Sequence, residues 1–127
     1  MRRNIQADKA PKAIGPYSQA ISTGHLLFTA GQIPISPLSG SLITGKIKEQ
    51  TKQVLENLKA VIEAGGSELA LVLKTTVYLT NPEDFPAMNE IYAHYFNTSP
   101  PARTTVFVSA LPKGALIEIE AVAMVKE

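Results

Sequence analysis

Residues 116–125 read LIEIEAVAMV, an alternating pattern that predicts a β-strand with two different faces. Successive side chains of a strand point to opposite sides of its sheet. One side receives the apolar residues Ile117, Ile119, Ala121 and Ala123. The other side receives Glu118, Glu120, Val122 and Met124. Because carboxylates mixed with apolar side chains make a poor monomer surface, and apolar patches usually mark contact sites, we expect a subunit interface that contains a polar pocket.

A second strand is predicted just before this one, over residues Thr104–Ala110. The connecting segment Leu111–Gly114 contains a proline and a glycine, which suit a turn. We therefore expect the two strands to pair as a hairpin. Arg103 would then precede the first strand while Glu118 begins the second, so that the guanidinium and the carboxylate could share one pocket at the open end of the pair.

Further upstream, two segments have the 3.6-residue apolar spacing of amphipathic helices. The first covers residues 47–64 and is followed by Gly65-Gly66, a favoured helix stop. The second starts near the N-cap candidates of residues 81–84 and runs to about Phe96. Between the helices, residues 72–79 are rich in β-branched side chains and predict a largely buried strand.

The first third of the chain predicts a hairpin followed by a loop. Residues 17–22 and 26–33 are predicted strands joined at Thr23-Gly24-His25, and the loop after them holds at most one short strand around residues 41–43. The order strands, helix, strand, helix, strands predicts an α+β two-layer sandwich. Its mixed sheet has five or six strands, with both helices on one face. At 127 residues, we expect one domain over 1–127.

Composition argues against several classes of protein. The formal net charge of +1 does not suggest a strongly basic nucleic-acid binder. The absence of cysteine excludes disulfides, thiolate nucleophiles and cysteine-based metal sites. The N-terminus does not resemble a signal peptide, and the longest apolar runs are far shorter than the ~20 residues of a membrane span. With no phosphate loop, paired-histidine zinc spacing or nucleophile elbow, we expect a cytoplasmic protein without metal, cofactor or membrane contact.

Arg103 is the first candidate site residue. It follows Pro100-Pro101-Ala102, whose rigid backbone could hold the guanidinium for a two-hydrogen-bond clamp on a small carboxylate. A surface or interfacial ion pair is the alternative, and spacing alone does not separate the two. For Glu118 and Glu120, alternation alone favours a solvated or ion-paired face.

Four other residues carry weaker indications. Tyr17 follows Gly15-Pro16 and could present its hydroxyl to a ligand or pack as a core aromatic. Gly31 could let a ligand approach the backbone, or it could form a β-bulge. His25 and His94 are isolated; His25 suits a turn and His94 the polar side of a helix, and neither is predicted to be catalytic.

Taken together, several segments resemble the Rid family of reactive intermediate and imine deaminases, also called the YjgF or L-PSP family. These segments are AIGPYSQA at 13–20, TAGQIP at 29–34, FPAMNEIY at 85–92, PAR at 101–103 and IEIEA at 117–121. They follow the family's order and span essentially the whole chain. The resemblance implies a chorismate-mutase-like fold and a homotrimer with sites between subunits. It also implies cofactor-free hydrolysis of 2-imino or enamine acids, such as 2-aminoacrylate and 2-iminobutyrate, to 2-keto acids and ammonia.

The resemblance also implies residue roles. Arg103 would bind the substrate carboxylate and Glu118 would hold and activate water. Pocket-lining positions would be Tyr17, Ala30, Gly31, Asn89 and Thr105. Two of these depart from the family pattern, because Thr105 stands where many relatives carry cysteine and Ala30 where serine is common. Neither change removes the arginine or the acid, so we expect activity to persist, while the sequence leaves the substrate range and affinity open.

Two other functions remain open at this stage. The first is a non-catalytic trimeric protein that binds small keto acids with the same Arg103 clamp. The second is an RNA-cleaving translation inhibitor, an activity attached to some relatives. Near-neutral charge and the lack of a histidine pair for acid–base work on a ribose disfavour this second alternative.

Overall fold

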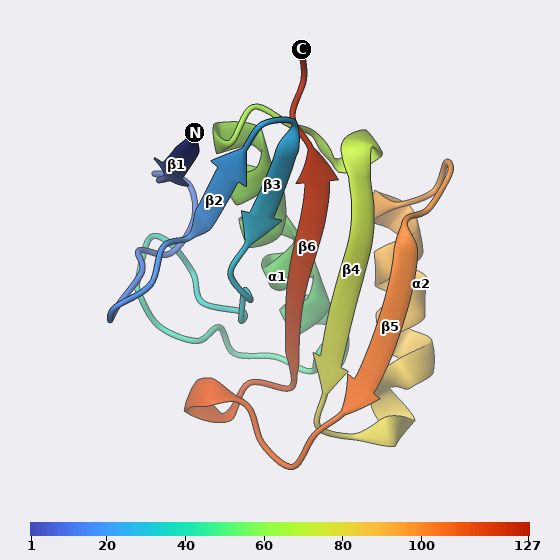
Figure 1. The fold of residues 1–127 in the computed structure, drawn as a ribbon. Helices are drawn as coiled ribbons and strands as arrows, with labels where there is room; N and C mark the ends of the chain where they lie inside the picture. Colours follow the sequence, from blue (N-terminus) through green and yellow to red (C-terminus); the bar gives the residue numbers. More distant parts are fainter.

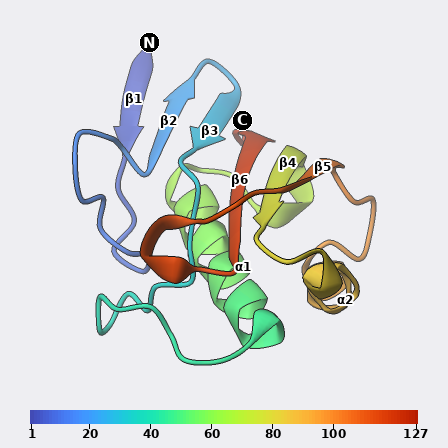
Figure 2. The ribbon, with the colours of Figure 1, turned by 90° about the horizontal axis from the view of Figure 1, so that it is seen from below.

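The structure, a computed structural model, describes all of residues 1–127 and contains one six-stranded mixed sheet. In chain order the elements are β1 (Arg2–Ile5), β2 (Ala20–Thr23), β3 (Leu26–Thr29), α1 (Ile47–Ala64), β4 (Val72–Leu79), α2 (Phe85–Tyr95), β5 (Ala102–Phe107) and β6 (Ile117–Met124). Across the sheet the order is β1-β2-β3-β6-β4-β5, and only β4 and β5 run parallel. Both helices cover the same face (Figures 1 and 2). The α+β prediction is confirmed.

The core lies between α1 and the centre of the sheet. The apolar stripe of α1 buries Val54, Leu55, Leu58, Val61 and Ile62. Ile117 and Ile119 of β6 are fully buried in the same cluster, and each aliphatic side chain removed from water contributes about 1.5–3 kcal/mol. The chain stops the helix at Gly65, where an added Cβ would lie 2.7 Å from Leu27 Cδ1. Neither helix is both long and apolar enough to cross a bilayer.

The predicted hairpin between the last two strands is wrong. β4 lies between β5 and β6, pairing parallel with β5 and antiparallel with β6. The reason is that α2 forms a crossover from β4 to β5, which places these two strands side by side. The segment around Pro112–Gly114 is then a connection that passes β4 and returns the chain to the centre of the sheet (Figure 1).

The N-terminal third departs from the prediction in detail. β2 and β3 form the expected hairpin around Gly24-His25, but both strands are shorter than predicted. The polar residues of β1 form an edge strand beside β2, which the sequence pattern did not indicate. The short strand expected around residues 41–43 is a single bridge between Ile35 and Leu42.

The second face of the sheet carries no helix. Glu118 and Glu120 point to this open face, because they alternate with residues of β6 that are buried under α1. Its large exposed apolar side chains include Leu26, Phe28, Val106 and Met124. The two-sided pattern predicted for residues 116–125 is therefore confirmed.

Candidate active site

A cleft of about 530 Å³ opens beside the segment that follows β3. Its lining includes four of the predicted site residues, namely Tyr17, Ala30, Gly31 and Glu118. Lys113, in the connection before β6, also lines it and adopts a left-handed backbone with φ of 58°. The cleft therefore brings together side chains and backbone from three separate segments around one carboxylate.

A β-bulge places Gly31 against Glu118. β3 and β6 pair Phe28 with Val122, and the next bridge pairs Gln32 with Ile119, so residues 29–31 face only residues 120–121. A Cβ at position 31 would lie 2.8 Å from Glu118 Cδ, so any larger residue would displace the carboxylate from its present position. The Gly31 N–H makes no backbone hydrogen bond. The bulge interpretation is confirmed, and the Gly31 N–H is left without a backbone partner.

Glu118 is half-buried and binds its proton more tightly than an ordinary carboxyl group does. Burial, and then the neighbouring charge of Glu120, raise the pKa of Glu118 above its ordinary value. A carboxyl group with a raised pKa suits proton transfer near neutral pH. At the rim of the cleft, the exposed Tyr17 accepts a hydrogen bond from the Ile14 N–H at 3.3 Å, so the phenol is anchored to its own loop.

Arg103 occupies a different place, on the helix-covered side of edge strand β5. Its guanidinium carbon lies 4.8 Å from the ring centroid of Tyr92 and 5.5 Å from that of Phe85. The Tyr92 hydroxyl shares a 2.7 Å hydrogen bond with Thr75, the register partner of Arg103. The chain's two ion pairs, Lys48–Glu90 and Lys126–Glu68, do not involve Arg103. The aromatic rings thus hold a guanidinium whose donors have no carboxylate partner in the chain.

Two more predicted site residues accompany Arg103. Thr105 is two residues further along β5 and therefore shares its face. Asn89 lies on α2 one turn from both Phe85 and Tyr92, on the side that faces the guanidinium. The predicted residues consequently separate into two groups, which we name the acid half-site (Tyr17, Ala30, Gly31, Glu118) and the arginine half-site (Asn89, Arg103, Thr105).

The prediction that Arg103 and Glu118 share a cavity within one chain is wrong. Their side chains lie on opposite faces of the sheet, with β4 between their strands. Arg103 pairs with Thr75 and Glu118 with Tyr78, which adds an offset of about 10 Å along the strands. The error follows from the hairpin assumption, because only a β5–β6 pair would have brought the two ends together.

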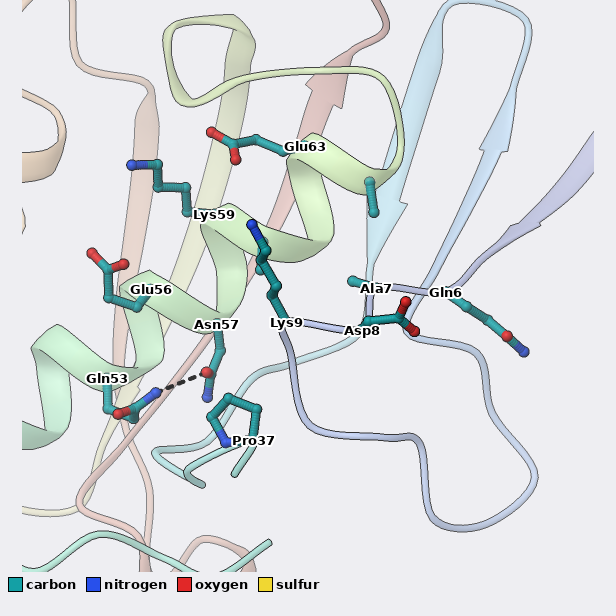
Figure 3. A pocket seen from close by; sticks show the side chains of 12 residues that line it. Gln6, Ala7, Asp8, Lys9, Pro37, Gln53, Glu56, Asn57, Lys59 and Glu63 are labelled. Atoms are coloured by element: carbon teal, nitrogen blue, oxygen red, sulfur yellow. Dashed lines mark hydrogen bonds between the residues drawn. The ribbon is translucent and has the colours of Figure 1, made fainter. Parts of the chain in front are cut away.

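A larger cleft of about 690 Å³ lies elsewhere, between residues 6–9 and the outer side of α1 (Figure 3). It contains none of the predicted site residues. At its base Asn57 donates to the carbonyls of Ile33 and Ile35 at 3.2 and 2.9 Å, and accepts from Gln53 at 2.9 Å. The buried side-chain amide of Asn57 therefore fastens the loop before α1 to the helix and is not free to bind a ligand.

Sequence reasoning missed the residues that support the two half-sites. Gln19 is buried and hydrogen-bonds to the backbone of Ala7 and Pro11, which fixes the loop beside the cleft. Tyr92 lies within the second predicted helix and the family segment 85–92, but no sequence pattern marked it as the support of Arg103. His25 and His94 are exposed and neither lines the cleft.

Comparisons with known proteins agree with the fold. The family described as Endoribonuclease L-PSP matches residues 7–125. A RutC family protein from Pyrococcus horikoshii is 58% identical over 123 residues, covering 97% of this chain and 98% of that protein. The human protein named 2-iminobutanoate/2-iminopropanoate deaminase is 48% identical over 124 residues, covering 98% and 90%. A crystal structure from Yersinia pestis, described as a protein of unknown function of the conserved Rid family, has a TM-score of 0.96 and 49% identity, covering 98% and 100%. The chain therefore belongs to the Rid family, also known as the YjgF or L-PSP family.

Proposed function

We propose that this protein is a cytoplasmic enzyme that hydrolyses 2-imino and enamine acids to 2-keto acids and ammonia. The observation that carries the proposal is the separation of two complementary half-sites. One holds a carboxyl group with a raised pKa beside a free backbone donor, and the other holds an unpaired guanidinium. The 48% identity to a human protein named 2-iminobutanoate/2-iminopropanoate deaminase supports the same chemistry.

In this proposal the working site forms between two copies of the chain. One copy supplies the acid half-site and the next supplies the arginine half-site, which a single chain cannot bring together. The open face offers an apolar contact surface that includes Phe28 and Met124, and β5 offers a free strand edge beside Arg103. A head-to-tail contact of this kind closes into a ring, and we propose a homotrimer.

The reaction needs orientation, water and proton transfer. Arg103 holds the substrate carboxylate, and Glu118 removes one proton from a water molecule as its oxygen bonds to the protonated imine carbon. Glu118 then passes that proton to the nitrogen of the carbinolamine. The C–N bond breaks, its electron pair leaves with ammonia, and the hydroxyl oxygen forms the ketone as its proton is released to the ammonia. The balance is one iminium acid plus one water to one keto acid plus one ammonium ion.

The remaining site residues set the shape of the pocket. In the proposed assembly, the N–H of Gly31 and the hydroxyl of Tyr17 bind the substrate from the acid half-site. Asn89 and Thr105 bind it from the arginine half-site. Ala30 and Thr105 replace a hydroxyl and a thiol found in many relatives, so we expect them to alter the choice of substrate side chain while leaving the reaction intact.

A coupled assay tests this function. A dehydratase generates 2-aminoacrylate or 2-iminobutyrate, and release of pyruvate or 2-ketobutyrate is followed with and without the protein. We expect acceleration by the wild type, loss of both turnover and keto-acid binding in Arg103→Ala, and loss of turnover with retained binding in Glu118→Gln. Keto-acid binding without acceleration at any enzyme concentration would establish the non-catalytic alternative. Equal loss of binding in both variants would contradict the assigned roles.

A further inference from the structure

Two carboxylates and one phenol meet on the open face, at the edge of the cleft. Glu120 follows Glu118 on the same face of β6, and Tyr78 of β4 is the register partner of Glu118. The Tyr78 hydroxyl donates a hydrogen bond to Glu120 Oε1 at 3.2 Å. Of the three residues only Glu118 lines the cleft. The two carboxylates therefore have different neighbours although they are two residues apart.

These neighbours give the two carboxylates different environments. Glu120 accepts a hydrogen bond from a phenol, whereas Glu118 accepts no hydrogen bond from any side chain of the protein. Burial, followed by the effect of Glu120, raises the pKa of Tyr78, so the phenol keeps its proton and remains a donor at neutral pH. Glu118 instead packs against Gly31 in the bulge, where burial disfavours its charged form.

Other titratable groups near Glu118 come from the segments that surround the cleft. Lys12 and Tyr17 line it from the N-terminal loop, and Lys113 lines it from the connection before β6. Neither lysine forms an ion pair with Glu118 within the chain. Glu120 is the charged neighbour that raises the pKa of Glu118.

We propose that Tyr78 and Glu120 are positioning residues that decide which of the two carboxylates exchanges protons in the reaction. Tyr78 holds Glu120 in place on the open face through its hydrogen bond, and the charge of Glu120 makes its neighbour Glu118 the carboxylate that takes a proton from water and returns it to nitrogen. The role of Glu118 in the reaction, as inferred in this way, rests on the proposed function. The predicted effect of Glu120 on the pKa of Glu118 is a property of the protein alone, so it is tested without substrate.

The test is an NMR titration of protein labelled with carbon-13 at the glutamate side-chain carboxyl group, with Glu118→Gln and Glu120→Gln used to assign the two signals. In Glu120→Gln we expect the Glu118 midpoint to move to lower pH. In Tyr78→Phe we expect the Glu118 midpoint to move towards its value in Glu120→Gln, because Glu120 loses the hydrogen bond that fixes its position. Glu68→Gln is the matched control, since this carboxylate pairs with Lys126 and does not line the cleft; it should leave both midpoints unchanged. A Glu118 midpoint that is the same in wild type and Glu120→Gln overturns the inference.

Kinetics separate this inference from the proposed function. In an active enzyme the acid limb of kcat/KM should move to lower pH in Glu120→Gln and stay in place in Glu68→Gln, with the mass of the assembly unchanged in both. NMR shifts in a protein that shows no turnover would reject the proposed function and keep the electrostatic pair. Turnover without the NMR shift in Glu120→Gln would reject the pair and keep the function.

Discussion

Gly31 and Glu118 are in such close contact that a single methyl group at position 31 would lie 2.8 Å from the carboxyl carbon of the acid. The bulge after β3 creates this contact, and the bulge exists because residues 29–31 face only two residues of β6. The position of the proposed catalytic carboxylate thus depends on the absence of a side chain on a different strand.

Gly31→Ala should therefore displace the Glu118 carboxylate and lower kcat/KM by about 100-fold, the scale expected for a misplacement near 1 Å. The coupled deaminase assay measures this loss. Ala30→Ser, in the same bulge, is the comparison, and it should keep turnover while changing the preferred side chain of the substrate. Wild-type kcat/KM in Gly31→Ala would show that the contact has no catalytic importance.

The aromatic support of Arg103 gives a second expectation. Tyr92→Leu removes the ring that lies 4.8 Å from the guanidinium, and a cation–π contact contributes about 0.5–2 kcal/mol. We expect the KM for the imino acid to rise with little change in kcat. Tyr92→Phe keeps the ring and loses only the Thr75 hydrogen bond, so it should lower the free energy of unfolding by about 1 kcal/mol with KM unchanged. An equal rise of KM in both variants would contradict this division.

The raised pKa of Glu118 predicts a pH-dependent stability difference. Because the folded protein holds this proton more tightly than the unfolded chain, folding loses stability as pH rises from the ordinary carboxyl pKa through the raised one. Glu118→Gln should consequently be more stable than the wild type at neutral pH and equal to it in acid. Urea unfolding at fixed protein concentration measures both. If Glu118→Gln were less stable than the wild type at pH 7, burial of the charged Glu118 carboxylate would not destabilise the folded protein as argued here.

Replacing Gln19 should destabilise the loop beside the cleft. Its side chain accepts from the Ala7 N–H at 2.6 Å and donates to the carbonyls of Ala7 and Pro11 at 3.3 and 2.6 Å. Gln19→Ala leaves buried backbone groups without partners and should cost about 1–3 kcal/mol of unfolding free energy. Thermal unfolding checks this, and unchanged stability would mean that water replaces the side chain. The variant Gln6→Ala, at an exposed position where the glutamine side chain makes no hydrogen bond within the chain, serves as the matched control.

Local sequence patterns predicted the elements better than their arrangement. α1 and β4 have the predicted bounds, because a 3.6-residue apolar period and a run of β-branched residues are strong local signals. The pairing of β5 was predicted wrongly, since the proline and glycine before β6 favour a hairpin locally while the α2 crossover determines the neighbour. Pairing is a long-range property that no window of sequence contains.

The same limit applies to the site. The sequence indicated Arg103 as a possible carboxylate-binding residue and Glu118 as a possible proton-transfer residue. Both lie beside or within predicted strands and within the family segments. Their placement on opposite faces depends on β4 lying between their strands, and hence on the topology. The support of Arg103 by Tyr92 could not be predicted, because a tyrosine in an apolar helix stripe has the same pattern whether it packs in a core or beneath a guanidinium.

Complementation between two inactive variants tests the shared site most directly. Arg103→Ala and Glu118→Gln are co-expressed with different tags, mixed assemblies are isolated, and turnover is compared with each variant alone. If each site takes its arginine and its acid from neighbouring copies of the proposed trimer, every mixed trimer contains one intact site in three, so the isolated mixed assemblies should recover about one third of the wild-type turnover. Activity that stays at the level of the separate variants, in assemblies shown to contain both chains, would contradict a site formed between copies.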